Sequence, residues 1–145
     1  MRTHRVVPFA LVPVVAIAML LPSVYGGEPL ERWSGSTVRI VAIDPPSATL
    51  LRPGERLHIA ATVEYFLAVE KGRIHVFVQC EESRVTVTKL QGQSITAGKG
   101  TAVVSAEIEV PRTGELQFIA ALYHPDSTST AVTSSRTYHV ATTTP

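Results

Sequence analysis

Residues 56–66, RLHIAATVEYF, alternate between two kinds of side chain along their whole length. One set of alternate positions is apolar or aromatic, and the other set is largely polar: Leu57, Ile59, Ala61, Val63 and Tyr65 against His58, Ala60, Thr62, Glu64 and Phe66. Because successive side chains of a β-strand point to opposite faces, this period of two predicts a long strand with one buried face. The stretch favours a protein built from β-sheet.

Six further segments carry the same alternation or a β-branched, apolar composition, namely residues 37–43, 73–80, 84–90, 101–110, 115–123 and 136–141. The segments between them contain turn-forming residues, so we expect a polar turn at 67–72 and loops at 91–100 and 126–135. No segment after residue 26 shows a helical period. About seven strands at a spacing of roughly 8–12 residues predict an all-β, single antiparallel β-sandwich over residues 37–141.

Two turns have a recognisable chemistry. Residues 51–55 read LRPGE, and residues 111–115 read PRTGE. In the first turn Pro53 presets the first backbone angle and Gly54 accepts the positive φ that a type II turn requires. The strand rhythm and these two turns resemble an immunoglobulin-like or fibronectin-type-III-like module of a bacterial exported protein. The paired cysteines and the core tryptophan of antibody domains are absent, so the resemblance implies a fold and no particular function.

The first 26 residues have the composition of a secretory signal peptide. Arg2 and Arg5 make a basic start, residues 6–21 are uncharged and apolar, and Pro22 ends the run. A run of this length is shorter than the roughly 20 residues that span a bilayer, although an uncleaved anchor stays an alternative. We therefore expect a signal peptide at 1–26, an N-terminal arm at 27–36, the sandwich at 37–141, a tail at 142–145, and a secreted or periplasmic protein.

Removal of residues 1–26 changes the charge balance. The chain has 13 basic and 12 acidic residues, and loss of Arg2 and Arg5 leaves 11 basic residues against 12 acidic ones, a net charge of −1. A surface without excess positive charge argues against a nucleic-acid partner. The remaining Cys80 cannot form an internal disulfide, and its place in the alternation predicts a core-facing position near a strand end, with an intermolecular bridge or a redox role as the alternative. We expect no membrane contact after cleavage.

The sequence lacks the patterns that hydrolases and metal proteins use. It has no Gly-x-Ser-x-Gly elbow and no His-Glu-x-x-His motif, and both methionines lie in the signal segment, which disfavours a blue-copper site. We expect a non-enzymatic protein without a cofactor or resident metal. The alternative is a small exported metal-binding protein or enzyme that uses His75, His124 or His139.

One group of apolar residues falls on the predicted outward face of the strands at 73–80 and 115–123. Phe77, Ile119 and Tyr123 belong to this group, and contiguous apolar residues on a surface can mark a partner site or the seat of the Trp33 arm. We therefore expect a module that binds another envelope or extracellular protein or a surface polymer, or that has an accessory role in the envelope. A further alternative is a chaperone-like module that pairs a strand edge with another chain.

Overall fold

The structure is a computed structural model that describes residues 35–125 and 132–142. The predicted signal peptide, most of the N-terminal arm with Trp33, and part of the predicted loop at 126–135 lie outside the described residues. Among the described residues, no helix is long and apolar enough to cross a membrane.

The described residues form six strands, and every pairing between them is antiparallel. They are β1 (Thr37–Asp44), β2 (Arg56–Cys80), β3 (Thr86–Gln91), β4 (Gln93–Glu109), β5 (Glu115–Tyr123) and β6 (Val132–His139). The predicted all-β antiparallel fold is confirmed.

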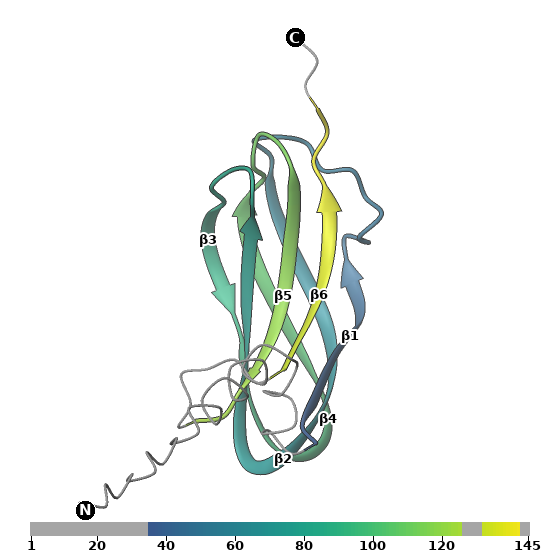
Figure 1. Cartoon of the computed structure of the whole chain (residues 1–145), viewed down its shortest axis with the longest axis vertical. Coiled ribbons are helices and arrows are strands. Elements are labelled where there is room, and N and C mark those ends of the chain that lie inside the picture. The colour runs from purple at the N-terminus through teal and green to yellow at the C-terminus, as the bar shows by residue number, and fades with distance from the viewer. Residues whose placement is uncertain (1–34, 126–131, 143–145) are drawn as a thin grey trace, which may run out of the picture.

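Two of these strands contribute to both layers of the sandwich. β4 pairs with β2 along its whole length, from Arg56 to Ile74 of β2, and the register shifts once, between Leu67 and Lys71 of β2. Figure 1 shows both strands turning together at the lower end of the molecule. Gly98, on the β4 side of this bend, has a φ of 94°, a conformation that favours glycine.

The bend divides the strands into two sheets. The first, called here the β3 sheet, has the order β1, β2 residues 56–67, β4 residues 98–109, and β3. The second, called here the β5 sheet, contains β4 residues 93–96, β2 residues 71–80, β5 and β6. These two strand orders match the two sheets of an immunoglobulin domain, so the predicted immunoglobulin-like resemblance is confirmed at the level of fold.

Three details of the predicted strands are wrong. The turn expected at 67–72 is part of β2, because the chain bends there while staying paired to β4. The loop expected at 91–100 is mostly strand, since β4 begins at Gln93. The last strand runs from Val132 to His139, so residues 132–135 of the expected loop belong to β6. Six strands are found instead of seven because two predicted strands are the halves of β2.

The two predicted turns have the expected geometry. Gly54 has a φ of 76°, and the Glu55 amide donates to the Arg52 carbonyl at 3.3 Å. Gly114 also has a positive φ, of 99°. Both turns therefore use glycine where the backbone needs a conformation that other residues rarely adopt.

Side chains join the two sheets where β1 faces β6. The Ile40 amide donates to the Ser134 hydroxyl at 3.0 Å, and the Arg136 guanidinium donates to the Ile40 carbonyl at 2.6 Å. The register of β1 shifts directly after Ile40. These two bonds satisfy backbone groups that an edge strand would otherwise leave open, so they close this flank of the sandwich.

The core lies between the sheets and is made by the inward alternate positions of every strand except β3. Its largest fully buried members include Ile59, Val63, Ile74, Val104, Ile108, Leu116, Phe118, Leu122 and Tyr138. Each such side chain contributes roughly 1.5–3 kcal/mol when it leaves water. Cys80 continues this alternation opposite Leu116 and is half-buried, with its sulfur 3.5 Å from the Ser83 hydroxyl.

Tyr138 is the largest buried side chain and carries a polar group into the core. Its ring is 0% exposed, and its hydroxyl donates to the Pro45 carbonyl at 2.6 Å. Burial, with a smaller contribution from the negative charge of Asp44, raises the pKa of Tyr138 to about 12. The bond ties β6 to the segment that follows β1.

Candidate binding face

The outward surface of the β5 sheet carries an apolar strip along β2 and β5, which we call the β5 face. Its members are His75 and Phe77 of β2 and Ile119, Ala121 and Tyr123 of β5. The register places His75 opposite Ala121 and Phe77 opposite Ile119, and opposite residues of an antiparallel pair point to the same side of the sheet. The three residues predicted from the sequence, Phe77, Ile119 and Tyr123, are therefore brought together.

Ring contacts connect the strip across the two strands. The rings of His75 and Tyr123 meet edge to face, with centroids 5.1 Å apart and planes at 90°. The centroids of Phe77 and Tyr123 are 6.2 Å apart, with planes at 61°. Phe77 is nevertheless 43% exposed, and Ala121 beside it in the strip is fully buried. The face is a packed apolar surface from which Phe77 is the most accessible aromatic ring.

Burial within this strip affects the ionisation of His75. Loss of solvent, followed by the positive charge of Arg73, lowers the pKa of His75 from its ordinary value of 6.5. The neutral imidazole is consequently favoured at neutral pH, which keeps the strip uncharged between its two ends.

Polar groups border the strip on its other sides. β6 contributes a row of small hydroxyl side chains, Thr133, Ser135 and Thr137, which lie opposite Ala121, Ile119 and Gln117. At one end the Gln79 amide donates to Gln117 at 2.9 Å, and His139 lies 3.2 Å from Glu115. At the other end, next to Arg73, a depression of about 390 Å³ is lined by Lys71, Gly72, Arg73, Ser94, Ile95, Thr96 and Pro125. An apolar centre with a polar rim is the composition of a binding surface.

The outward surface of the β3 sheet is different in character. Its cross-strand neighbours pair opposite charges, namely Arg39 with Glu64, Arg56 with Glu109, and Lys89 with Glu107. The Arg39 guanidinium and the Glu64 carboxylate are 2.8 Å apart, with both side chains more than half exposed. Such exposed pairs solvate a sheet and contribute little to stability. Phe66 and Val103 are also exposed on this surface, so the feature that distinguishes the β5 face is its set of contacting rings.

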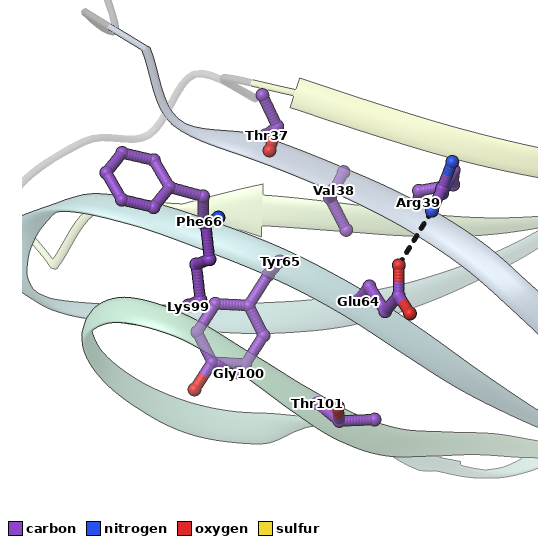
Figure 2. Close-up of a pocket in the computed structure, with 9 residues that line it drawn as sticks. All are labelled: Thr37, Val38, Arg39, Glu64, Tyr65, Phe66, Lys99, Gly100 and Thr101. Atoms are coloured by element: carbon purple, nitrogen blue, oxygen red, sulfur yellow. Dashed lines mark hydrogen bonds and ion pairs between the residues drawn. The ribbon is translucent and has the colours of Figure 1, made fainter.

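A larger depression, of about 720 Å³, lies on the β3 sheet beside the bend (Figure 2). Thr37, Arg39, Glu64, Phe66 and Lys99 line it together with Val38, Tyr65, Gly100 and Thr101. Figure 2 shows the Tyr65 ring close to Gly100 and the Arg39–Glu64 ion pair along the rim. A Cβ atom at residue 100 would overlap the Tyr65 ring, so a larger residue there would require that ring to move. Two of its three charged groups, Arg39 and Glu64, already pair with each other, which leaves less to recognise a ligand.

Two histidines of the metal alternative, His75 and His139, lie far apart. His75 and His139 belong to the same sheet with β5 between them, but their partners on β5 are Ala121 and Glu115. Those partners are six residues apart, which corresponds to about 20 Å along a strand. Within residues 35–125 and 132–142, no group of three or more His, Cys, Asp or Glu side chains could hold a metal ion.

Sequence reasoning found the aromatic members of the face but did not assign His75 to it. The alternation alone shows which residues share a side of one strand, whereas the His75–Tyr123 contact depends on the register between β2 and β5. Thr133 and Ser135 of the β6 row belong to a segment whose serine and threonine content indicates a loop, so the sequence alone does not predict this row. The Trp33 arm lies outside the described residues, so its place is untested.

Comparison with known proteins gives similarities at the level of structure only. No protein-family model matches the sequence, and no curated protein matches it. The chain is similar to the CARDB domain of the PF1109 protein from Pyrococcus furiosus, with 12% identity, 74% of this chain and 94% of that chain covered, and a TM-score of 0.48.

Two further solved structures are similar. For the periplasmic chaperone SfaE the identity is 13%, the coverage 74% of this chain and 58% of that chain, and the TM-score 0.41. For the ASH/PapD-like domain of human CEP192 the identity is 10%, the coverage is 75% of this chain and 82% of that chain, and the TM-score is 0.39. At these identities and TM-scores the similarities carry no statement about function.

Proposed function

We propose that this protein is an exported, non-enzymatic binding module that holds another protein of the envelope or extracellular space on its β5 face. The proposal rests on one observation, the exposed Phe77 ring at the centre of a packed apolar strip with a polar rim. Soluble domains rarely expose contiguous apolar surface without a use for it. Aromatic side chains on such surfaces supply much of the binding energy at protein interfaces.

The ring geometry favours a protein partner over a surface polysaccharide. A flat sugar chain is best bound by rings that lie in one plane, because each sugar stacks on a ring face. Here the planes of Phe77 and Tyr123 are at 61°, and those of His75 and Tyr123 are perpendicular. Rings at such angles offer no single flat platform for stacked sugars, whereas side chains of a protein can contact both ring edges and ring faces.

The proposal is tested by substitution on the two opposite surfaces of the sandwich. The Phe77→Ser and Tyr123→Ser double variant removes both rings from the β5 face. Phe66→Ser is the matched control, because Phe66 is a partly exposed phenylalanine on the other sheet, at 37%. Both proteins should give the circular dichroism of the wild type.

The readout is the set of envelope proteins that each tagged variant captures in its native cells. We expect the double variant to lose a partner that the wild type and Phe66→Ser both retain. Truncating buried aromatic anchors typically costs 2 kcal/mol or more, roughly a thirtyfold weakening. The same proteins captured in the same amounts by all three would contradict the assignment. Loss of binding to a purified wall polymer instead of a protein would contradict the class of partner.

A further inference from the structure

Most strand edges of this sandwich are covered or irregular. β1 and β6 face each other, and the Ser134 and Arg136 side chains bond the backbone of Ile40. β3 is a short edge strand whose register shifts between Val87 and Lys89. Bulges, lysines and side-chain coverage are the means by which natural proteins prevent unwanted strand pairing. These edges therefore offer little regular backbone to another chain.

One edge has none of these features. β2 pairs with β4 only as far as Ile74, whereas its pairing with β5 continues to Cys80. Residues 75–80, HVFVQC, which we call the open edge, therefore have no strand partner among the described residues on the side away from β5. The open edge contains no proline, glycine or lysine. Alternate residues along it direct their N–H and C=O groups away from β5.

A gap in the core lies beside the open edge. Val87 and Leu90 of β3 lie opposite the buried residues Ile108 and Ala106, so the register points them toward the interior. They are nevertheless 38% and 48% exposed, because the β5 sheet ends one strand short of β3. Val78 of the open edge is only half-buried for the same reason. A strand added to the open edge would lie over β3 and cover these side chains.

The shape of the gap restricts what can occupy it. β3 lies beneath the position of the added strand, so a second folded copy, with its own β3 and β4 beneath its β2, would overlap this one. The chain's own residues 27–34, GEPLERWS, do not fit either. Their large apolar residues, Leu30 and Trp33, are three positions apart, and Pro29 lacks an N–H. The open edge therefore suits an extended segment of a partner protein, with no second layer behind it.

The charges beside the open edge specify the sequence of that segment. Arg73 precedes the edge and Glu81 follows it, and both are exposed. Glu81 lines a small depression with Gln79 and Gln117, on the outward side of the β5 sheet. A residue opposite His75 is a diagonal neighbour of Arg73, so an acidic side chain is favoured there. A residue opposite Gln79 is a diagonal neighbour of Glu81, so a basic side chain is favoured at that position.

We propose that the open edge binds an extended segment of a partner protein, which pairs antiparallel as an added strand of the β5 sheet. From its N-terminus, the segment has apolar residues at its first, third and fifth positions, opposite Cys80, Val78 and Val76, where they cover Val87 and Leu90. Its second position is basic and its sixth is acidic. In this mode of recognition main-chain hydrogen bonds provide affinity, and the alternate side chains provide specificity.

The probe is the peptide Val-Lys-Val-Thr-Val-Glu, blocked at both ends and titrated into the isotope-labelled full-length exported protein. We expect NMR chemical-shift changes concentrated at residues 75–80 and along β3. The charge-exchanged peptide Val-Glu-Val-Thr-Val-Lys should bind about twofold to thirtyfold more weakly, because both diagonal pairs become repulsive. The Arg73→Glu and Glu81→Arg double variant should reverse this preference. No shift along the open edge at millimolar peptide, or an unchanged preference in the double variant, would overturn the proposal.

A second set of variants tests the gap itself. Val87→Asp and Leu90→Asp each place a charge where the added strand would bury it, so each should abolish peptide binding. Val103→Asp is the matched control, because Val103 is a 60% exposed valine on the outward surface of the β3 sheet. All three variants are checked for folding by circular dichroism. Equal binding by all three would overturn the proposal.

This inference does not rest on the proposed function. The Phe77→Ser and Tyr123→Ser double variant removes the rings of the β5 face but keeps the backbone of the open edge and the inward side chains. It should therefore still bind the peptide, even where it no longer captures a partner protein. Loss of peptide binding in Val87→Asp with capture through Phe77 retained would show that the two sites are separate.

Discussion

Replacing Tyr138 by phenylalanine removes one hydroxyl from the core and leaves the ring in place. The Pro45 carbonyl then loses its 2.6 Å hydrogen bond. Because Pro45 is only half-buried, Tyr138→Phe should lower the free energy of unfolding at neutral pH by the net value of one intramolecular hydrogen bond, about 0.5–1.5 kcal/mol. Urea denaturation of both proteins measures the difference.

The same substitution has a second signature at high pH. Burial and the nearby Asp44 charge raise the pKa of Tyr138 from 10.0 to about 12 in the folded protein. Between these values the unfolded chain has released the proton and the folded chain still holds it, so the wild type loses stability as the pH rises. Two pH units correspond to at most about 3 kcal/mol. The phenylalanine variant lacks this loss, and the gap between the two proteins should narrow above pH 10.

Tyr65→Phe provides the control, because Tyr65 is half-buried beside Gly100 and its ring stays in place. That variant keeps the Tyr138 hydroxyl, so it should retain the loss of stability at high pH that the Tyr138 proton causes. If Tyr138→Phe is as stable as the wild type at neutral pH, the hydrogen bond contributes nothing. A constant difference up to pH 12 would refute the link between burial and ionisation.

Three further outcomes follow from the packing and the charges. Phe118→Ala opens a cavity at a fully buried site and should cost about 3–5 kcal/mol in urea denaturation. Gly100→Ala forces a Cβ atom into the Tyr65 ring and should lower the melting temperature, and combining it with Tyr65→Ala should recover part of the loss. The lowered pKa of His75 means that the unfolded chain takes up a proton first as the pH falls below 6.5, so acid should destabilise the wild type more than His75→Gln. Melting curves between neutral pH and about pH 5 measure this; equal acid sensitivity would contradict it.

The sequence predicted those parts of the fold that depend on alternation within one strand. β1, β5 and the first half of β2 were placed correctly because their apolar residues recur at every second position. The composition of Glu70, Lys71 and Gly72 predicts a turn at 67–72, where the structure has a bend within β2. Pairing with β4, a contact between distant segments, keeps these residues in the sheet.

The start of β6 shows the same limit. Ser134 belongs to a segment whose composition is typical of loops, yet its hydroxyl accepts the Ile40 amide and closes the sandwich. That role depends on where β1 and β6 meet, which no local pattern encodes. The candidate face was partly predictable for a similar reason. Alternation placed Phe77 and Tyr123 outward, but the contact between Tyr123 and His75 follows from the register of two strands.

The central claim is that the β5 face binds a partner protein, and site-specific photo-cross-linking tests it most directly. The method detects contact while only the residue at the probe position is changed. A photoreactive phenylalanine analogue is placed at residue 77 on the β5 face or at residue 66 on the opposite sheet, and each protein is irradiated in its native cells. Our account predicts a covalent adduct with a partner protein from position 77 and none from position 66. Equal adducts from both positions, or adducts from position 66 alone, would contradict it.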